Sequence, residues 1–261
     1  MIDQIILMGG KGKDGTPEAV TEVVFKMGDV VSVVGPTGSG KTTLINDIEL
    51  FADGSTPTGR RVLIDGVAPG REYRDDPAHH PIALITQHTN FLSDLPVPEF
   101  LSIHAEIRNS NGASTDETVA RTMAFANSLT GEAILPAYRM TELSGGQTRA
   151  LLIADAVVIG NAPIVLLDEI ENAGIHRMRA LELLRRFQKI FVFVTHDPYI
   201  ALLSDFRIVI ANGAMRAVIR SGEPEHLLAG RVRRADDLLS YFRDRIRSGG
   251  LLTPEDVEVL A

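Results

Sequence analysis

Residues 30–51 read "VVSVVGPTGSGKTTLINDIELF", and this stretch decides the fold. The β-branched run at 30–35 is typical of a buried strand, and a helix is predicted to begin within 38–51. Between them, residues 35–42 match the pattern G-x-x-x-x-G-K-[ST] in full. A glycine-rich loop between a strand and a helix is the context that identifies a phosphate-binding P-loop.

The P-loop residues suit a nucleoside triphosphate with its metal ion. Gly38 and Gly40 let the backbone wrap closely, so that successive N–H groups point at a polyphosphate. Lys41 places a positive charge near the β and γ phosphates, and the Thr42 hydroxyl can ligate Mg²⁺.

A second candidate site lies in "PIVLLDE", residues 163–169, where an apolar strand ends in two acids. Ligands of open α/β sheets bind at the carboxyl ends of strands. Asp168 can therefore hold the Mg²⁺, and Glu169 can orient or deprotonate the water that attacks the γ phosphate. The competing interpretation is that these acids only cap the next helix.

Strands and helices alternate along the chain, with apolar strands at 30–35, 82–87, 163–169 and 190–197. This pattern predicts an α/β fold with a largely parallel sheet covered on both faces. Segments 2–8, 20–25 and 59–66 also read as strands. Residues 89–159 are helical instead, and Ser114 with Glu117 forms a predicted capping box.

Composition excludes several classes of protein. The net charge of −8 argues against nucleic acid as a partner. The chain has no cysteine, so a disulfide framework and a thiol nucleophile are excluded. No apolar run reaches the roughly 20 residues that a membrane span needs.

A second anion site is predicted in "ELSGGQTRALLIADAVV", residues 142–158. Its Ser-Gly-Gly turn precedes a helix, whose first N–H groups have no partner within the helix. This turn lies about a hundred residues beyond the P-loop, so one chain carries two phosphate sites far apart in sequence.

The order of five motifs along the chain indicates why it carries two phosphate sites far apart in sequence. "GPTGSGKTT" (35–43), Gln87, "LSGGQ" (143–147), "IVLLDE" (164–169) and "VTHD" (194–197) resemble the ATP-binding cassette (ABC) ATPases over about residues 20–225. The resemblance implies a P-loop NTPase (RecA-like) core, an antiparallel β subdomain and an inserted helical subdomain at about 89–159. It also implies an ABC ATPase domain over 1–230, followed by a C-terminal helical extension over 231–261.

By this resemblance, two cassettes meet head to tail, and the P-loop of one and the LSGGQ turn of the other bind the same ATP. Glu169, His196 and Gln87 would be catalytic, and Thr42, Gln87 and Asp168 would ligate Mg²⁺. The nucleotide would contact Gly35, Pro36, Thr37, Gly38, Ser39, Gly40, Lys41, Thr42 and Thr43 of one chain, and Ser144, Gly145, Gly146 and Gln147 of the other.

The chain departs from the family pattern at three places. In the helix after the signature turn, Arg149 is the only basic residue, where family members carry more. No aromatic residue precedes Phe25 to stack on the adenine, so Met8 or Val20 would pack on the base instead. Selectivity for ATP over GTP is therefore implied by the family alone. The loop "IENAGIH" (170–176) has Ile175 where the family has an aspartate. Communication between the two cassettes would then be altered, or would be carried by Asn172 or His176.

The resemblance implies Mg²⁺-dependent ATP hydrolysis, and two roles for it remain open. The first is the ATP-binding subunit of a membrane transporter. Such a subunit forms a homodimer or pairs with a second ABC subunit, works with a separate permease, and is cytoplasmic or peripheral at the inner face of the cell membrane. The alternative is an ABC ATPase that is no transporter and acts on a protein or metallocofactor assembly.

The last segment, 231–261, lies beyond the motifs. Leu238, Leu239, Phe242 and Ile246 fall on one predicted helical face, and six arginines accompany three aspartates between 231 and 247. We expect this helix to pack on its own domain; docking on a partner or an anionic surface is the alternative.

Overall fold

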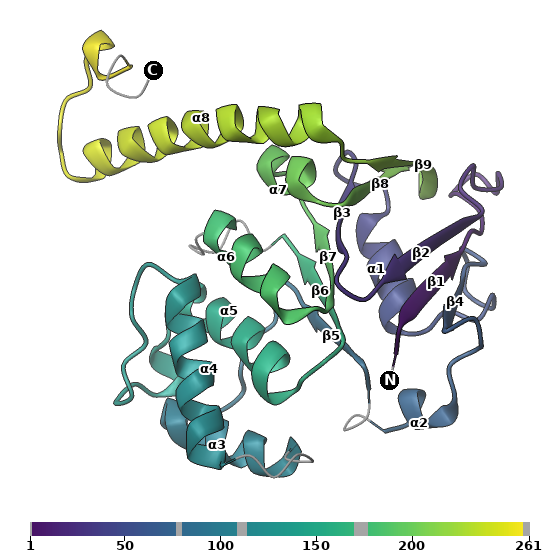
Figure 1. Ribbon diagram of the computed structural model, residues 1–261, viewed down its shortest axis with the longest axis horizontal. Helices are drawn as coiled ribbons and strands as arrows, with labels where there is room; N and C mark the ends of the chain where they lie inside the picture. Colours follow the sequence, from purple (N-terminus) through teal and green to yellow (C-terminus); the bar gives the residue numbers. More distant parts are fainter. Residues whose placement is uncertain (1, 77–79, 109–113, 170–176, 258–261) are drawn as a thin grey trace.

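The computed structural model describes residues 2–76, 80–108, 114–169 and 177–257. A six-stranded sheet forms its centre, with strand order β5-β6-β7-β3-β8-β9 (Figure 1). The first five strands of that order are parallel, and β9 is antiparallel to β8. The strands are β3 (Val30–Val34), β5 (Ile82–Ile85), β6 (Ile164–Asp168), β7 (Ile190–Val194), β8 (Phe206–Ala211) and β9 (Ala214–Arg220).

A smaller antiparallel sheet of three strands, in the order β2-β1-β4, stands beside the central sheet (Figure 1). Its strands are β1 (Gln4–Met8), β2 (Glu22–Lys26) and β4 (Arg61–Ile64), with the short helix α2 (Arg71–Arg74) after them. This sheet and the P-loop helix α1 (Lys41–Glu49) share a hydrophobic core with one face of the central sheet. The predicted α/β class with an antiparallel β subdomain is confirmed.

Helices α3 (Val97–Arg108), α4 (Thr115–Leu129) and α5 (Gly145–Ala154) form the helical part, which has its own apolar cluster. The predicted capping box at α4 is wrong: Ser114 is the N-cap residue, yet its side chain makes no capping hydrogen bond. Helix α5 continues as a π-helical turn, Asp155–Ile159. The Asp155 carboxylate in that turn lies 2.7 Å from His104 Nδ1 of α3.

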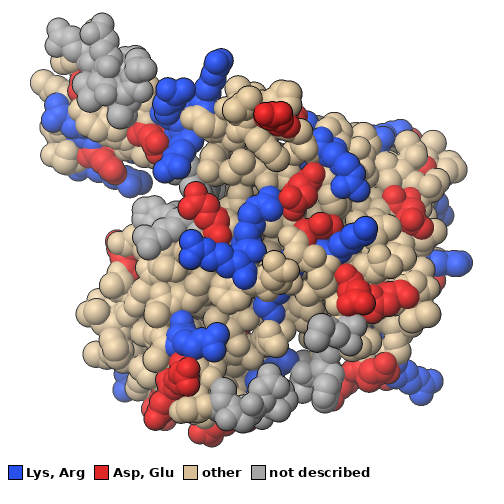
Figure 2. Space-filling model, viewed as in Figure 1, with Lys and Arg blue, Asp and Glu red and all other residues tan. Residues whose placement is uncertain are grey.

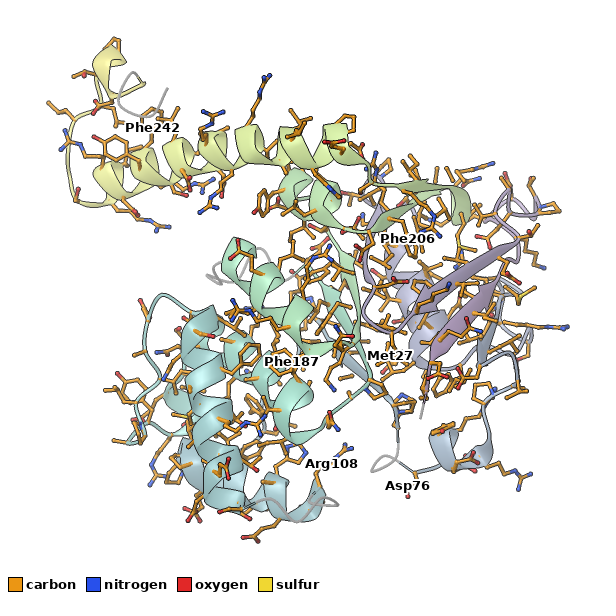
Figure 3. The ribbon with its side chains drawn as sticks, viewed as in Figure 1. Met27, Asp76, Arg108, Phe187, Phe206 and Phe242 are labelled. Carbon is orange, nitrogen blue, oxygen red and sulfur yellow. The ribbon has the colours of Figure 1, made fainter. Side chains whose placement is uncertain are left out.

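The second face of the central sheet is covered by α5, α6 (Arg177–Leu184) and α7 (Pro198–Leu203). Successive side chains of a strand point to opposite faces of the sheet. Along β7, Val192 and Val194 point into the first core, whereas Phe191 and Phe193 point into the second. Phe187, after α6, packs edge-on against Phe125 of α4 with ring centroids 4.9 Å apart (Figure 3). This contact ties the helical part to the sheet.

Helix α8 (Glu223–Arg247) crosses position 230, where the sequence indicated a boundary. Its first half packs on α7, and its second half projects beyond the rest of the chain (Figure 1). Ala229 is its only buried residue. The expected packing of the tail on its own domain therefore holds for the first half of α8 and fails for the second. Within the described residues, no helix has the length and apolarity needed to cross a membrane.

Lys189 carries a buried positive charge. Its burial predicts that the free energy of unfolding depends on pH. Its ammonium donates to Asn161 Oδ1 at 2.7 Å and to the Ala162 carbonyl at 2.9 Å, and burial lowers its pKa from 10.5 to about 8. Between these two values the unfolded chain binds more protons than the folded chain, so stability rises with pH. Relative to Lys189→Met, the wild-type free energy of unfolding should rise by up to about 3 kcal/mol across this window.

Denaturant unfolding at several pH values from 7 to 10 measures this difference. Lys26→Met is the matched control, because Lys26 is exposed on β2, and its difference from the wild type should stay flat. Parallel pH profiles for wild type and Lys189→Met would contradict the prediction.

Candidate nucleotide-binding site

The predicted site residues of three motifs meet at one edge of the central sheet. Strands β6, β7 and β3 are neighbours and parallel, with Val33 and Asp168 both in register with Val194. The segments that follow these strands therefore emerge at the same edge. They carry the P-loop, the acidic pair and His196.

The P-loop turns sharply because its glycines allow it. Gly40, the N-cap of α1, has φ +103°, and a Cβ there would lie 2.9 Å from Gly213 Cα. The Gly213 N–H donates to the Ser39 carbonyl at 2.7 Å. The turn between β8 and β9 therefore supports the loop from behind, while Pro36, Thr37 and Gly38 are exposed.

Lys41 lies inside the P-loop and is largely buried. Its ammonium donates to the carbonyls of Gly35 at 2.9 Å and Pro36 at 3.2 Å, and lies 3.1 Å from His196 Nε2. A lysine ammonium only donates, so this contact is a hydrogen bond in the tautomer whose Nε2 carries no proton. The structure thus brings two residues 155 positions apart into direct contact.

Glu169 completes a row of three functional groups. Its Oε1 lies 3.8 Å from His196 Nε2, and both side chains are partly exposed. The Glu169 backbone is left-handed, with φ +51°, a conformation that costs a non-glycine residue on the order of 1 kcal/mol. Such strained conformations cluster at functional sites. The sequence carried no signal of this strain.

The predicted metal ligands surround the same edge. Thr42 and Thr43 are exposed in the first turn of α1, Asp168 ends β6, and Gln87 is exposed two residues after β5. A hydroxyl, a carboxylate and an amide oxygen suit Mg²⁺, which usually takes one or two protein carboxylates and completes its shell with phosphates and water. Among the residues that the structure describes, no group of three or more histidine, cysteine or acidic side chains is arranged to hold a metal ion.

The LSGGQ turn stands apart from the P-loop, on the helical part of the chain. Ser144 is the N-cap of α5 and forms a capping box with Gln147, whose Oε1 accepts from the Ser144 N–H at 2.9 Å. The Gln147 amide also donates to the Ala133 carbonyl at 3.2 Å. Gln147 is therefore buried and holds the turn, whereas Ser144 and Gly145 are exposed at the helix N-terminus.

Arg149 links the segment after β5 to the start of α5, a contact that sequence reasoning missed. Its guanidinium donates to the Gln87 carbonyl and, at 3.2 Å, to the Gly145 carbonyl. The Arg149 guanidinium therefore joins the Gln87 carbonyl to the first residue of α5. The only signal in the sequence was the isolated arginine itself.

The loop between β1 and β2 reaches the P-loop, which the sequence also did not indicate. The Lys13 ammonium donates to the Gly38 carbonyl at 2.8 Å, and the backbone N–H of Lys13 donates to the Asn212 carbonyl at 2.9 Å. Of the two residues expected near the base, Met8 ends β1 and is partly exposed, and Val20 packs against the main core. Ile175, Asn172 and His176 lie outside the described residues.

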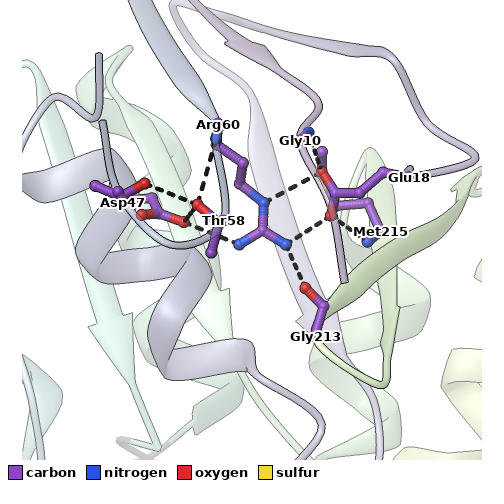
Figure 4. A network of polar contacts seen from close by, with 8 residues as sticks. Gly10, Glu18, Asp47, Thr58, Arg60, Gly213 and Met215 are labelled. Carbon is purple, nitrogen blue, oxygen red and sulfur yellow. Dashed lines mark hydrogen bonds and ion pairs between the residues drawn. The ribbon is translucent and has the colours of Figure 1, made fainter. Parts of the chain in front are cut away.

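A buried ionic network anchors the P-loop helix (Figure 4). The fully buried Arg60 bonds Glu18 at 2.6 Å, Asp47 of α1 at 3.0 Å and the Gly213 carbonyl at 2.7 Å. Glu18 also accepts from the N–H groups of Gly10 at 2.7 Å and Met215 at 2.5 Å. The network joins α1, the β1–β2 loop and the β8–β9 turn.

The fold and this site define a P-loop nucleoside triphosphatase. The family model described as "ABC transporter" matches residues 21–172. Over 259 residues the chain is 46% identical to an uncharacterized ABC transporter ATP-binding protein of Methanocaldococcus jannaschii, covering 99% of this chain and 98% of that one. The chain therefore belongs to the ABC transporter family.

Two further comparisons agree. The chain is 28% identical to a lipoprotein-releasing system ATP-binding protein of Bacteroides thetaiotaomicron, over 75% of this chain and 90% of the relative. A dimeric ATP-binding cassette solved with ADP and Pi shares the fold, with a TM-score of 0.63 and 24% identity over 83% of this chain and 98% of that one. The predicted family, fold class and ABC-type ATPase activity are confirmed.

Proposed function

We propose that two copies of this chain, or this chain and a second ABC subunit, bind two Mg·ATP head to tail and hydrolyse them to drive a separate membrane permease. One observation carries the proposal. Lys41, His196 and Glu169 converge at one sheet edge, while Ser144 and Gly145 are exposed on another part of the chain. Each part supplies half of a phosphate site, which a second cassette would complete.

The chemistry follows from the positions of the groups. The P-loop amides and Lys41 would hold the phosphates. Thr42, Asp168 and Gln87 would ligate Mg²⁺, which would neutralise the developing phosphate charge. Glu169 takes the proton of the attacking water, and His196 contacts the γ phosphate. The N-terminus of α5 from the second cassette adds its dipole and free N–H groups.

Lys41→Ala tests the P-loop assignment. Removing the only side-chain cation that lies within the loop should weaken ATP binding and reduce turnover to background, because the β and γ phosphates lose their counter-charge. Fluorescent ATP-analogue binding and phosphate release measure the two effects. Lys11→Ala, which removes an exposed lysine of the β1–β2 loop, is the control and should retain activity. Full activity of Lys41→Ala would remove the assignment.

The transporter role needs a partner, which a pull-down can identify. The bait is tagged Glu169→Gln, which Mg·ATP is expected to hold in its ATP-bound state. It is incubated with detergent-solubilised cells of its own source, and mass spectrometry identifies the proteins that it captures. A stoichiometric protein with several membrane spans would support a transporter subunit at the cytoplasmic face of the membrane. A soluble enzyme or scaffold without such a protein would favour action on a protein or metallocofactor assembly.

A further inference from the structure

Helix α8 exposes an apolar surface that its own domain does not cover. The sequence alone indicated a helix from about residue 231, whereas the structure starts it at Glu223. Over this full length, apolar residues follow one another at spacings of 4, 3, 4, 3 and 4. They are Leu228, Val232, Ala235, Leu239, Phe242 and Ile246, and we call this row the α8 seam. The spacing is that of the a and d positions of a coiled coil.

The α8 seam lies on a different side of the helix from the contact with α7. Ala229 is buried there, and Arg233 and Asp237 of α8 are among the charges around Tyr199 of α7. At the angular step of an α-helix, these three residues lie roughly 100–180° around the axis from the seam. Intramolecular packing therefore leaves the seam available.

Exposure along the α8 seam confirms this. The exposed fractions are 46% for Leu228, 50% for Leu239 and 63% for Ile246. The turn Pro254–Val257 folds back on α8 through Asp256, which accepts from the Tyr241 hydroxyl at 2.9 Å. Tyr241 is off the seam, and Phe242 lies near this end of the helix (Figure 3). The turn thus leaves Leu239 and Ile246 uncovered.

We propose that the α8 seam pairs with the same seam of a second copy, forming a short parallel two-helix coiled coil that does not require nucleotide. The charges beside the seam favour this occupant and this direction. In a parallel pair, Arg231 at a g position faces Asp236 at an e position of the other helix, twice by symmetry. An antiparallel pair would instead bring Arg231 towards Arg245 across the seam.

A basic surface along α8 is visible in Figure 2, with acidic side chains between the arginines. Residues 231–247 carry six arginines and three aspartates, which gives this segment a charge of +3. The same segment could attract an anionic membrane, and salt would weaken that attraction. Pairing of the apolar seam would persist in salt.

Cysteine cross-linking tests the proposal directly, because the natural chain has no cysteine. Leu228→Cys and Leu227→Cys introduce neighbouring exposed thiols, one on the seam and one off it. With a parallel pair, mild oxidation of nucleotide-free protein should convert Leu228→Cys to a covalent dimer at least tenfold faster than Leu227→Cys. Equal rates, or no dimer from either variant, would overturn the proposal.

A mixture of Leu228→Cys and Ile246→Cys tests whether the two α8 helices pair in parallel or antiparallel. Preferential cross-linking between the two different variants would show an antiparallel pair and overturn the parallel arrangement. Sedimentation of the full chain without nucleotide should show a concentration-dependent dimer, which Leu239→Glu weakens at least tenfold and Leu227→Glu does not. A monomer at every concentration, with salt-sensitive binding to anionic phosphatidylserine vesicles, would assign the surface to a membrane instead.

Discussion

Glu169→Gln is expected to lower ATP turnover by about 10²–10⁴-fold while leaving ATP binding intact. The amide has nearly the same shape as the carboxylate but cannot accept the proton of the attacking water. Glu169 lies 3.8 Å from His196, which in turn contacts Lys41 of the P-loop, so the substitution acts where the γ phosphate is expected. Since hydrolysis opens the proposed dimer, the variant should accumulate as an ATP-bound dimer.

Phosphate release measures the turnover. Light scattering with saturating Mg·ATP measures the head-to-tail dimer in a variant that also carries Leu239→Glu, so that pairing through α8 does not contribute. Glu132→Gln changes an exposed acid outside the site and should keep turnover within about twofold of the wild type, as is usual for surface substitutions. Undiminished turnover of Glu169→Gln would exclude Glu169 as the base. A variant that remains monomeric with ATP would count against the head-to-tail arrangement. Because Leu239→Glu weakens the proposed α8 pairing, this measurement reports the head-to-tail dimer alone. The α8 pairing is tested by the nucleotide-free experiments on chains that keep Leu239.

Arg60→Met is expected to destabilise the chain by about 3–5 kcal/mol, because it leaves the charges of Glu18 and Asp47 buried without their cation. Arg60 is fully buried, and both carboxylates are largely buried. The Glu18 carboxylate would keep the N–H groups of Gly10 and Met215, and Asp47 would keep the Thr58 hydroxyl. These neutral donors cannot replace a guanidinium.

Denaturant unfolding measures the loss, and Arg61→Met is the matched control. Arg61 is the next residue along the chain and is exposed on β4, so its replacement should change stability by less than about 1 kcal/mol. Arg60 also supports the turn whose Gly213 holds the P-loop. We therefore expect ATP affinity to fall at temperatures where Arg60→Met is still folded. A loss under about 1 kcal/mol would contradict the importance of the network.

Much of the fold and of the candidate site could be predicted because their signals are local. A P-loop needs its glycines, lysine and threonine consecutively, and a buried strand needs a continuous apolar run. The same holds for Asp168 and Glu169, which directly follow such a run. Parallel strands also end at a common edge, so the meeting of Lys41, Glu169 and His196 follows from the order of the motifs.

Other features depend on residues that only folding brings together. Nothing local marks Arg60 as the partner of Glu18, 42 positions away, Lys13 as a contact of Gly38, or Arg149 as the link to Gln87. A charged side chain in a sequence is read as exposed by default, and its burial is decided by what packs around it.

Helix α8 shows most clearly which features the sequence determines and which the tertiary structure decides. The sequence by itself determined that the tail is helical and carries apolar residues on one face, because periodicity is a local property. Where the helix begins, which side packs on α7 and which side stays exposed were decided by the tertiary structure. The physical reason is that burial depends on the neighbours of a surface in space, and the sequence around α8 does not contain them.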